Sequence, residues 1–139
     1  MIRIEQTADL ATCHALRRAV FIDEQGIPEA EEWDDLDATS AHLLAYVDDT
    51  PLGTARLRQV GEEGRIGRVC VLAPARGTGL GAALVRFGVD WYRQQPGVTS
   101  VVLGAQCHAL PFYEKLGFAT FGPVYDDAGI PHQDMRAPV

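Results

Sequence analysis

The hydrophobic pattern of the first forty residues predicts a strand followed by a helix. Residues 1–6 (MIRIEQ) alternate apolar and polar positions, which is typical of a β-strand. Asp9 then stands where a helix-capping carboxylate belongs, and Gly26 and Pro28 end the segment. A short second helix is expected around residues 29–36. The first helix is indicated by an apolar stripe at Leu10, Cys13, Leu16 and Val20.

The middle of the chain predicts three neighbouring strands. Residues 42–47 (HLLAYV) and 52–60 (LGTARLRQV) are separated by the turn cluster DDTP, and residues 65–72 (RIGRVCVL) follow the turn GEEG. Tight turns join consecutive strands only when the strands run antiparallel. We therefore expect an antiparallel meander.

The last third predicts a helical crossover. One helix is expected from residue 80 until Pro96-Gly97, and residues 98–103 (VTSVVL) form a buried strand parallel to its partner. A shorter helix around 109–116 and one or two closing strands complete the chain. The long helix shows its apolar face in the stripe Leu80, Ala83, Leu84, Phe87 and Trp91.

Length and composition indicate one domain covering residues 1–139, with 47% apolar and 22% charged residues. No segment has signal-peptide form, and no apolar run reaches the roughly 18 residues of a membrane helix, so we expect a cytoplasmic protein without a membrane partner. Cys13, Cys70 and Cys107 include no CxxC pair, which favours reduced, packed thiols.

The charge is unevenly distributed. The net charge of −7 argues against a nucleic-acid partner, because phosphate contacts need a basic surface. Residues 23–37 carry eight carboxylates and no Lys or Arg, whereas residues 56–93 carry seven arginines. The first region suits cations and the second suits anions, although ordinary solvated surface explains either one.

A glycine-rich turn at residues 73–84 (APARGTGLGAAL) predicts an anion site. The first turn of a helix leaves backbone N–H groups unpaired, and glycines allow a ligand close to the backbone. A Walker A loop would need GxxxxGK[ST], but the only lysine is Lys115. The turn also fits GxGxxA, although the dinucleotide fold wants an acidic residue after the following strand, where VVLGAQ has none. A tight connection without a ligand is the structural alternative.

Two motifs together resemble the GNAT acyl-CoA-dependent acetyltransferases. The run from Arg76 to Gly81 fits the pyrophosphate-binding pattern R/Q-x-x-G-x-G/A of that superfamily, and FYEKLGF (112–118) is similar to its second motif. Residues 21–45, with GIPH at 129–132, also look like a bacterial branch of small single-domain members whose acceptors are poorly defined. The resemblance implies an α/β (α+β) fold: a mixed, mostly antiparallel central sheet of six to seven strands, with helices on both faces and splayed central strands.

The resemblance implies acetyl-CoA as cosubstrate and an amine as acceptor. By position, Val69 and Val71 would hold the pantetheine arm, and the Val71 N–H would polarise the thioester carbonyl. Tyr113 occupies the position of the family's tyrosine and would act as general acid or thiolate stabiliser. The remaining cofactor contacts fall on Arg76, Gly77, Thr78, Gly79, Gly81 and Ala82.

The general base is harder to assign. Many GNAT enzymes place a glutamate on the strand before the glycine turn, but RIGRVCV offers only arginines. Glu24 is the preferred candidate, because the first-helix region borders the acceptor site in this fold. His42, His108 and His132 are the other candidates, with a structural role as the alternative for each. Adjacent Cys107 and His108 would point to opposite sides of an extended segment, which argues against an acyl-cysteine.

The sequence leaves the partners open. The acceptor is expected to be a small-molecule amine or a protein or peptide amine, drawn in by the acidic segment 23–37, and a homodimer is possible. The four histidines show no HxH or HExxH spacing, so the sequence gives no indication of a metal site. The missing strand glutamate motivates an alternative, an acyl-CoA-binding or regulatory module without turnover. A dinucleotide-dependent oxidoreductase is a third hypothesis.

Overall fold

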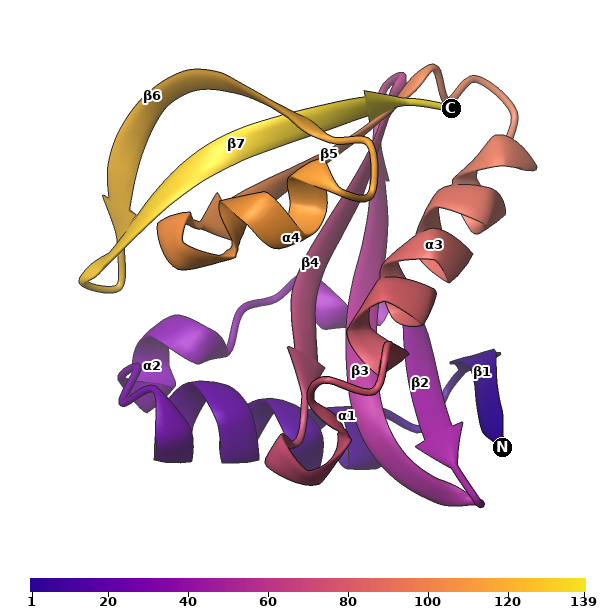
Figure 1. The fold of residues 1–139 in the computed structure, drawn as a ribbon, viewed down its shortest axis with the longest axis vertical. Coiled ribbons are helices and arrows are strands. Elements are labelled where there is room, and N and C mark those ends of the chain that lie inside the picture. The colour runs from indigo at the N-terminus through magenta and orange to yellow at the C-terminus, as the bar shows by residue number, and fades with distance from the viewer.

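The computed structural model describes all residues from Met1 to Val139 and contains one seven-stranded sheet (Figure 1). Its strand order is β1-β2-β3-β4-β5-β7-β6, and only β4 and β5 run parallel. The mixed, mostly antiparallel sheet is therefore confirmed, with two closing strands. The strands are β1 (Ile2–Thr7), β2 (Ala41–Val47), β3 (Thr50–Val60), β4 (Glu63–Val71), β5 (Ser100–Gln106), β6 (Ala119–Asp127) and β7 (Ile130–Pro138).

The helices begin where the sequence indicates but differ in extent. Helix α1 (Leu10–Arg17) is capped by the Asp9 carboxylate, which accepts from the Thr12 N–H, and continues as a π-helix, η1 (Arg18–Glu24). The predicted helix over 29–36 is wrong in length, because α2 (Glu29–Glu32) is a single turn. The connecting helices α3 (Leu80–Arg93) and α4 (Leu110–Glu114) match their predictions closely.

Adjacent residues of β2 enter two different cores. Leu43 packs in the larger cluster with α3, whereas Leu44 packs in the smaller cluster with α1 and η1. Successive strand side chains point to opposite faces, so α1 and α3 cover opposite faces of the sheet. This arrangement confirms helices on both faces. Figure 1 also shows β6 and β7 curving over α4.

The centre of the sheet separates into a wedge. Strands β4 and β5 pair only where residues 63–65 meet residues 100–102, and the strands have no pairing beyond that point. A bulge lies in the part of β4 that does not pair with β5. There Arg68 has a φ of 51°, and the register of β4 with β3 shifts. A bulge bends its strand. The splayed central strands are therefore confirmed.

Candidate functional site

Two cavities meet at the wedge between β4 and β5. The larger, about 720 Å³, is lined by η1, β4, β5 and the β6–β7 hairpin. The smaller, about 490 Å³, is lined by the end of β4, the glycine turn, α3 and α4. Both are lined by Val69, Val71 and Tyr113. We name them the hairpin cavity and the glycine cavity.

The glycine cavity brings the predicted cofactor residues together. Gly77 and Gly79 have φ values of 78° and 87°, a conformation in which a side chain is strained. Gly79 is the N-cap of α3 and supplies no side-chain hydrogen bond, so the first N–H groups of this 14-residue helix are available to an anion. Seven of the eight predicted residues line this cavity: Val69, Val71, Arg76, Gly77, Gly79, Gly81 and Ala82.

Two side chains of this turn are engaged with protein groups. Thr78, the eighth predicted residue, does not line the cavity, because its hydroxyl donates to the Ala75 carbonyl. Arg76 lines both cavities, but its Nε donates to the Val71 carbonyl at 3.0 Å. Its other end lies 2.7 Å from a Glu24 carboxylate oxygen. An anion in the turn would therefore compete with Glu24 for this guanidinium.

Tyr113 lies where the two cavities meet. Its ring packs edge-on against Phe112 and Phe118, and no hydrogen-bond partner occupies its hydroxyl. Burial raises the pKa of Tyr113 to about 12. The phenol therefore stays protonated at neutral pH and can donate a hydrogen bond at the wedge.

The base candidates separate by position. Glu24, His108 and His132 line the hairpin cavity, whereas His42 lines neither cavity. His42 is buried, and its Nε2 lies 2.9 Å from the Asp37 carbonyl. The structure therefore brings three of the four candidates together.

The cysteines give no nucleophile at the wedge. Cys107 and His108 belong to a 3-10 turn, η4 (Cys107–Ala109), so the prediction of an extended segment is wrong there. Cys70 lines both cavities, a position that sequence reasoning missed because the strand pattern marked it only as packed. Burial raises the pKa of Cys70 to about 12, which keeps this thiol protonated and inert.

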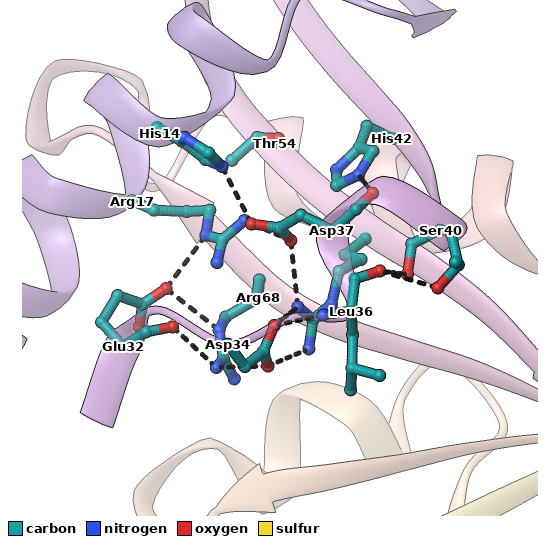
Figure 2. Close-up of polar contacts among 12 residues, drawn as sticks. His14, Arg17, Glu32, Asp34, Leu36, Asp37, Ser40, His42, Thr54 and Arg68 are labelled. Carbon is teal, nitrogen blue, oxygen red and sulfur yellow. Dashed lines mark hydrogen bonds and ion pairs between the residues drawn. The ribbon is translucent and has the colours of Figure 1, made fainter. Parts of the chain in front are cut away.

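An ion-pair network connects the acidic segment to the sheet (Figure 2). Arg17, only 1% exposed, donates from Nε to Glu32 and from another nitrogen to Asp37, both at 2.9 Å. Arg56 donates to Asp34 at 2.8 Å and to Asp37 at 3.0 Å. The third arginine is the bulge residue itself. We call Arg17, Arg56, Arg68, Glu32, Asp34 and Asp37 the arginine network.

The arginine network holds the bulge in β4. The Arg68 guanidinium donates to the Glu32 carbonyl at 2.9 Å and lies 3.0 Å from the Glu32 carboxylate. Non-glycine residues rarely adopt positive φ, and such strain persists only where surrounding contacts hold it. The network therefore supports the backbone directly before Val69.

These contacts change the interpretation of the acidic segment. Three of its carboxylates, Glu32, Asp34 and Asp37, are paired with arginines from α1, β3 and β4. Burial opposes the charge on Asp37, but hydrogen bonds from Arg17, Arg56 and His14 outweigh it and hold the pKa of Asp37 far below its usual range. Three of the seven arginines of residues 56–93, Arg56, Arg68 and Arg76, form ion pairs with carboxylates of the acidic segment.

The structure contains neither a side-chain cluster for a metal ion nor a helix suited to span a membrane. No group of three or more His, Cys, Asp or Glu side chains could hold a metal ion. None of the helices is both long and apolar enough to span a bilayer.

Known proteins are similar to this chain in sequence and in architecture. The Acetyltransferase (GNAT) domain family matches residues 10–138. The uncharacterized protein YyaT of Bacillus subtilis is 39% identical over 133 residues, which are 94% of this chain and 89% of that protein. An acyl-CoA N-acyltransferase from Pseudomonas aeruginosa has a similar crystal structure, with a TM-score of 0.86 and 33% identity over 99% of this chain and 98% of the other.

The chain belongs to the GNAT acetyltransferase family. A more distant crystal structure, N-acetylglutamate synthase from Neisseria gonorrhoeae complexed with coenzyme A and N-acetyl-glutamate, covers 99% of this chain and 35% of that one. Its TM-score is 0.73 at 18% identity, which shows a shared fold.

Proposed function

We propose that the protein is an acetyl-CoA-dependent N-acetyltransferase that transfers the acetyl group directly to a primary amine in a ternary complex. The observation that carries this proposal is the meeting of two cavities at the unpaired edge of β4. The glycine cavity has the features of a pyrophosphate site, and the hairpin cavity has room for an acceptor. Both adjoin Val69 and Val71, so donor and acceptor could meet without a covalent enzyme intermediate.

The glycine turn, the wedge and Tyr113 divide the work of the reaction. The pyrophosphate of acetyl-CoA would lie on the N–H groups that open α3. The pantetheine arm would pair with the free edge of β4, where the Val71 N–H stabilises the oxyanion, a contribution of about 3 kcal/mol. Loaded with acetyl-CoA, the site would supply a thioester whose carbonyl carbon accepts the amine.

Tyr113 acts on the leaving sulfur. A thiol of pKa about 8.5 is more acidic than this tyrosine, whose pKa burial raises, so complete proton transfer from Tyr113 to the thiolate is unfavourable. A hydrogen bond from the neutral phenol to the developing thiolate costs no such transfer. We therefore assign Tyr113 as thiolate stabiliser in preference to full general acid.

The test is an acceptor screen that follows release of the CoA thiol. Purified protein is mixed with acetyl-CoA and a panel of small amines, amino acids and peptides, and calorimetry with CoA measures binding separately. Thiol release with at least one amine, together with the acetylated product by mass spectrometry, supports the proposal. CoA binding without release for every amine supports the binding or regulatory module instead.

A further inference from the structure

His132 lines the hairpin cavity beside the wedge. Strand β5 pairs with β4 as far as Val102 and Arg65, and beyond that point Gln106 of β5 and Val69 of β4 both line the hairpin cavity. Gln106 pairs directly with His132 on β7. His132 therefore lines the same cavity as Val69 and Val71, the residues of the unpaired edge of β4.

One ring nitrogen of His132 is committed to the backbone. Its Nδ1 lies 2.7 Å from the carbonyl oxygen of Ile130. A carbonyl oxygen can only accept, so Nδ1 carries the hydrogen of the neutral ring. The other nitrogen, Nε2, then holds a lone pair, and no protein group donates to it. A neutral imidazole with a free Nε2 is the form that a general base requires.

The ring itself is held in place by its neighbours. It stacks on Tyr125 with 5.8 Å between ring centroids and 25° between planes. The Tyr125 hydroxyl donates to Asp134 at 2.8 Å, and it occupies the space beside Gly104, where a Cβ would lie 2.5 Å from the oxygen. Because Gly104 has no side chain, the Tyr125 hydroxyl can lie beside it, and the Tyr125 ring in turn orients His132.

The other candidates in the cavity are less well placed to act as the base. Both carboxylate oxygens of Glu24 lie within 3.0 Å of Arg76, so protonation would break that ion pair. The Nε2 of His108 contacts the Gln106 side-chain oxygen at 2.6 Å, which leaves its Nδ1 free, but the ring is exposed to solvent and no aromatic neighbour orients it. Only His132 combines a half-buried, stacked ring with a fixed tautomer.

We propose that His132 is the general base that deprotonates the acceptor amine, directly or through one water. The inference rests on the proposed N-acetyltransferase function. An alkylammonium of pKa about 10 must lose a proton before it can attack at neutral pH. Nε2 takes that proton, and the amine lone pair forms the C–N bond as the carbonyl electrons move to oxygen. Collapse breaks the C–S bond and releases CoA thiolate.

The protons balance in this sequence. The first proton leaves His132 for solvent, and the second amine proton ends on the CoA sulfur. The products are therefore the amide, the CoA thiol and one free proton. Other ionisable groups lining this region also contribute to the pH dependence, namely Tyr113, Tyr125, Asp127, Asp134, His108 and the ion pair of Glu24 with Arg76.

The experiment compares His132→Gln with the wild type, using the best amine from the acceptor screen. We expect kcat/KM at pH 7 to fall about 10²-fold, because a positioned base contributes about that much. The CoA dissociation constant and the melting temperature should stay near wild type. Activity of the variant should recover as the pH approaches about 10, where solution supplies the neutral amine.

A second measurement separates a base from a structural residue. A fluorinated analogue of the same amine has a lower pKa and is already neutral at pH 7, so the variant should lose little activity with it. An equal loss with both amines, or full activity of His132→Gln, would overturn the assignment. Loss of activity in Glu24→Gln or His108→Gln while His132→Gln stays active would reassign the base. Absence of thiol release in the wild type refutes the proposed function itself.

Discussion

Removing the charge of Asp37 should destabilise the protein strongly. Its side chain is 12% exposed and accepts hydrogen bonds from Arg17, Arg56 and His14 at 2.9 to 3.0 Å. Asp37→Asn removes one charged partner from both buried arginines, Arg17 and Arg56. Breaking a buried ion pair costs about 3 to 5 kcal/mol. We expect about 3 kcal/mol, because Glu32 still pairs with Arg17 and Asp34 still pairs with Arg56.

Urea unfolding followed by circular dichroism measures this difference. At pH 7 the midpoint should shift to lower urea, and the melting temperature should fall by about 10 °C. Asp35→Asn is the matched control, since Asp35 is an exposed carboxylate of the same segment without an ion-pair partner. That control should change the unfolding free energy by less than about 0.5 kcal/mol.

The pH dependence gives a second check on the same reasoning. The folded-state pKa of Asp37 lies below its unfolded value of about 3.9, so its contribution is present above that pH and is lost on acidification. The difference between wild type and Asp37→Asn should therefore shrink steadily below about pH 4. An equal difference at pH 7 and pH 3 would refute ionic stabilisation by this residue, as would a pH 7 difference below about 0.5 kcal/mol.

Three further substitutions test the site and its support. Tyr113→Phe should lower kcat about 10²-fold with CoA affinity unchanged in calorimetry, because it removes one hydrogen-bond donor to the developing thiolate, and an unchanged kcat would remove Tyr113 from the reaction. Gly79→Ala should weaken CoA binding and cost about 1 to 3 kcal/mol of stability, whereas Gly26→Ala, with a φ of 73°, should show the stability cost alone. Gly64→Ala should cost about 1 to 3 kcal/mol in urea unfolding, because its Cβ would lie 2.5 Å from the buried Tyr92 ring. Gly67→Ala, with no neighbour within 4 Å, should cost much less.

Local patterns predicted the elements that local chemistry determines. The stripe from Leu80 to Trp91 and the glycines before it indicated a helix with a free N-terminus, and the structure has that helix. The parallel pairing of β4 and β5 followed from the helical crossover between them. These features depend on residues close in sequence, so periodicity and spacing are sufficient to find them.

Long-range pairing explains what the sequence left out. The acidic segment read as solvated surface or a cation site, because the pattern cannot show that Arg17, Arg56 and Arg68 converge on it. The single turn of α2 found in place of a helix over residues 29–36 has the same cause, since Glu32 and Asp34 pair with arginines of the sheet and of α1. The positive φ of Arg68 had no sequence signal, because an arginine does not indicate the left-handed region.

The base assignment shows a similar limit. The sequence favoured Glu24 as the base and left three histidines as the other candidates, and only the fold shows how these side chains are placed. The assignment of His132 depends on the register of β5 with β7 and on the Ile130 carbonyl that fixes the tautomer of its ring. The GIPH segment was visible in the sequence, but its position relative to Val69 depends on pairing between distant strands.

The short pairing between β4 and β5 also has a mechanical consequence. The sheet consists of two halves, β1-β2-β3-β4 and β5-β7-β6, which are joined by only three residue pairs between β4 and β5. Any molecule bound in the wedge contacts both halves and adds a second set of contacts between them. Occupancy would then do more than supply a substrate, because it would couple the unfolding of one half to that of the other.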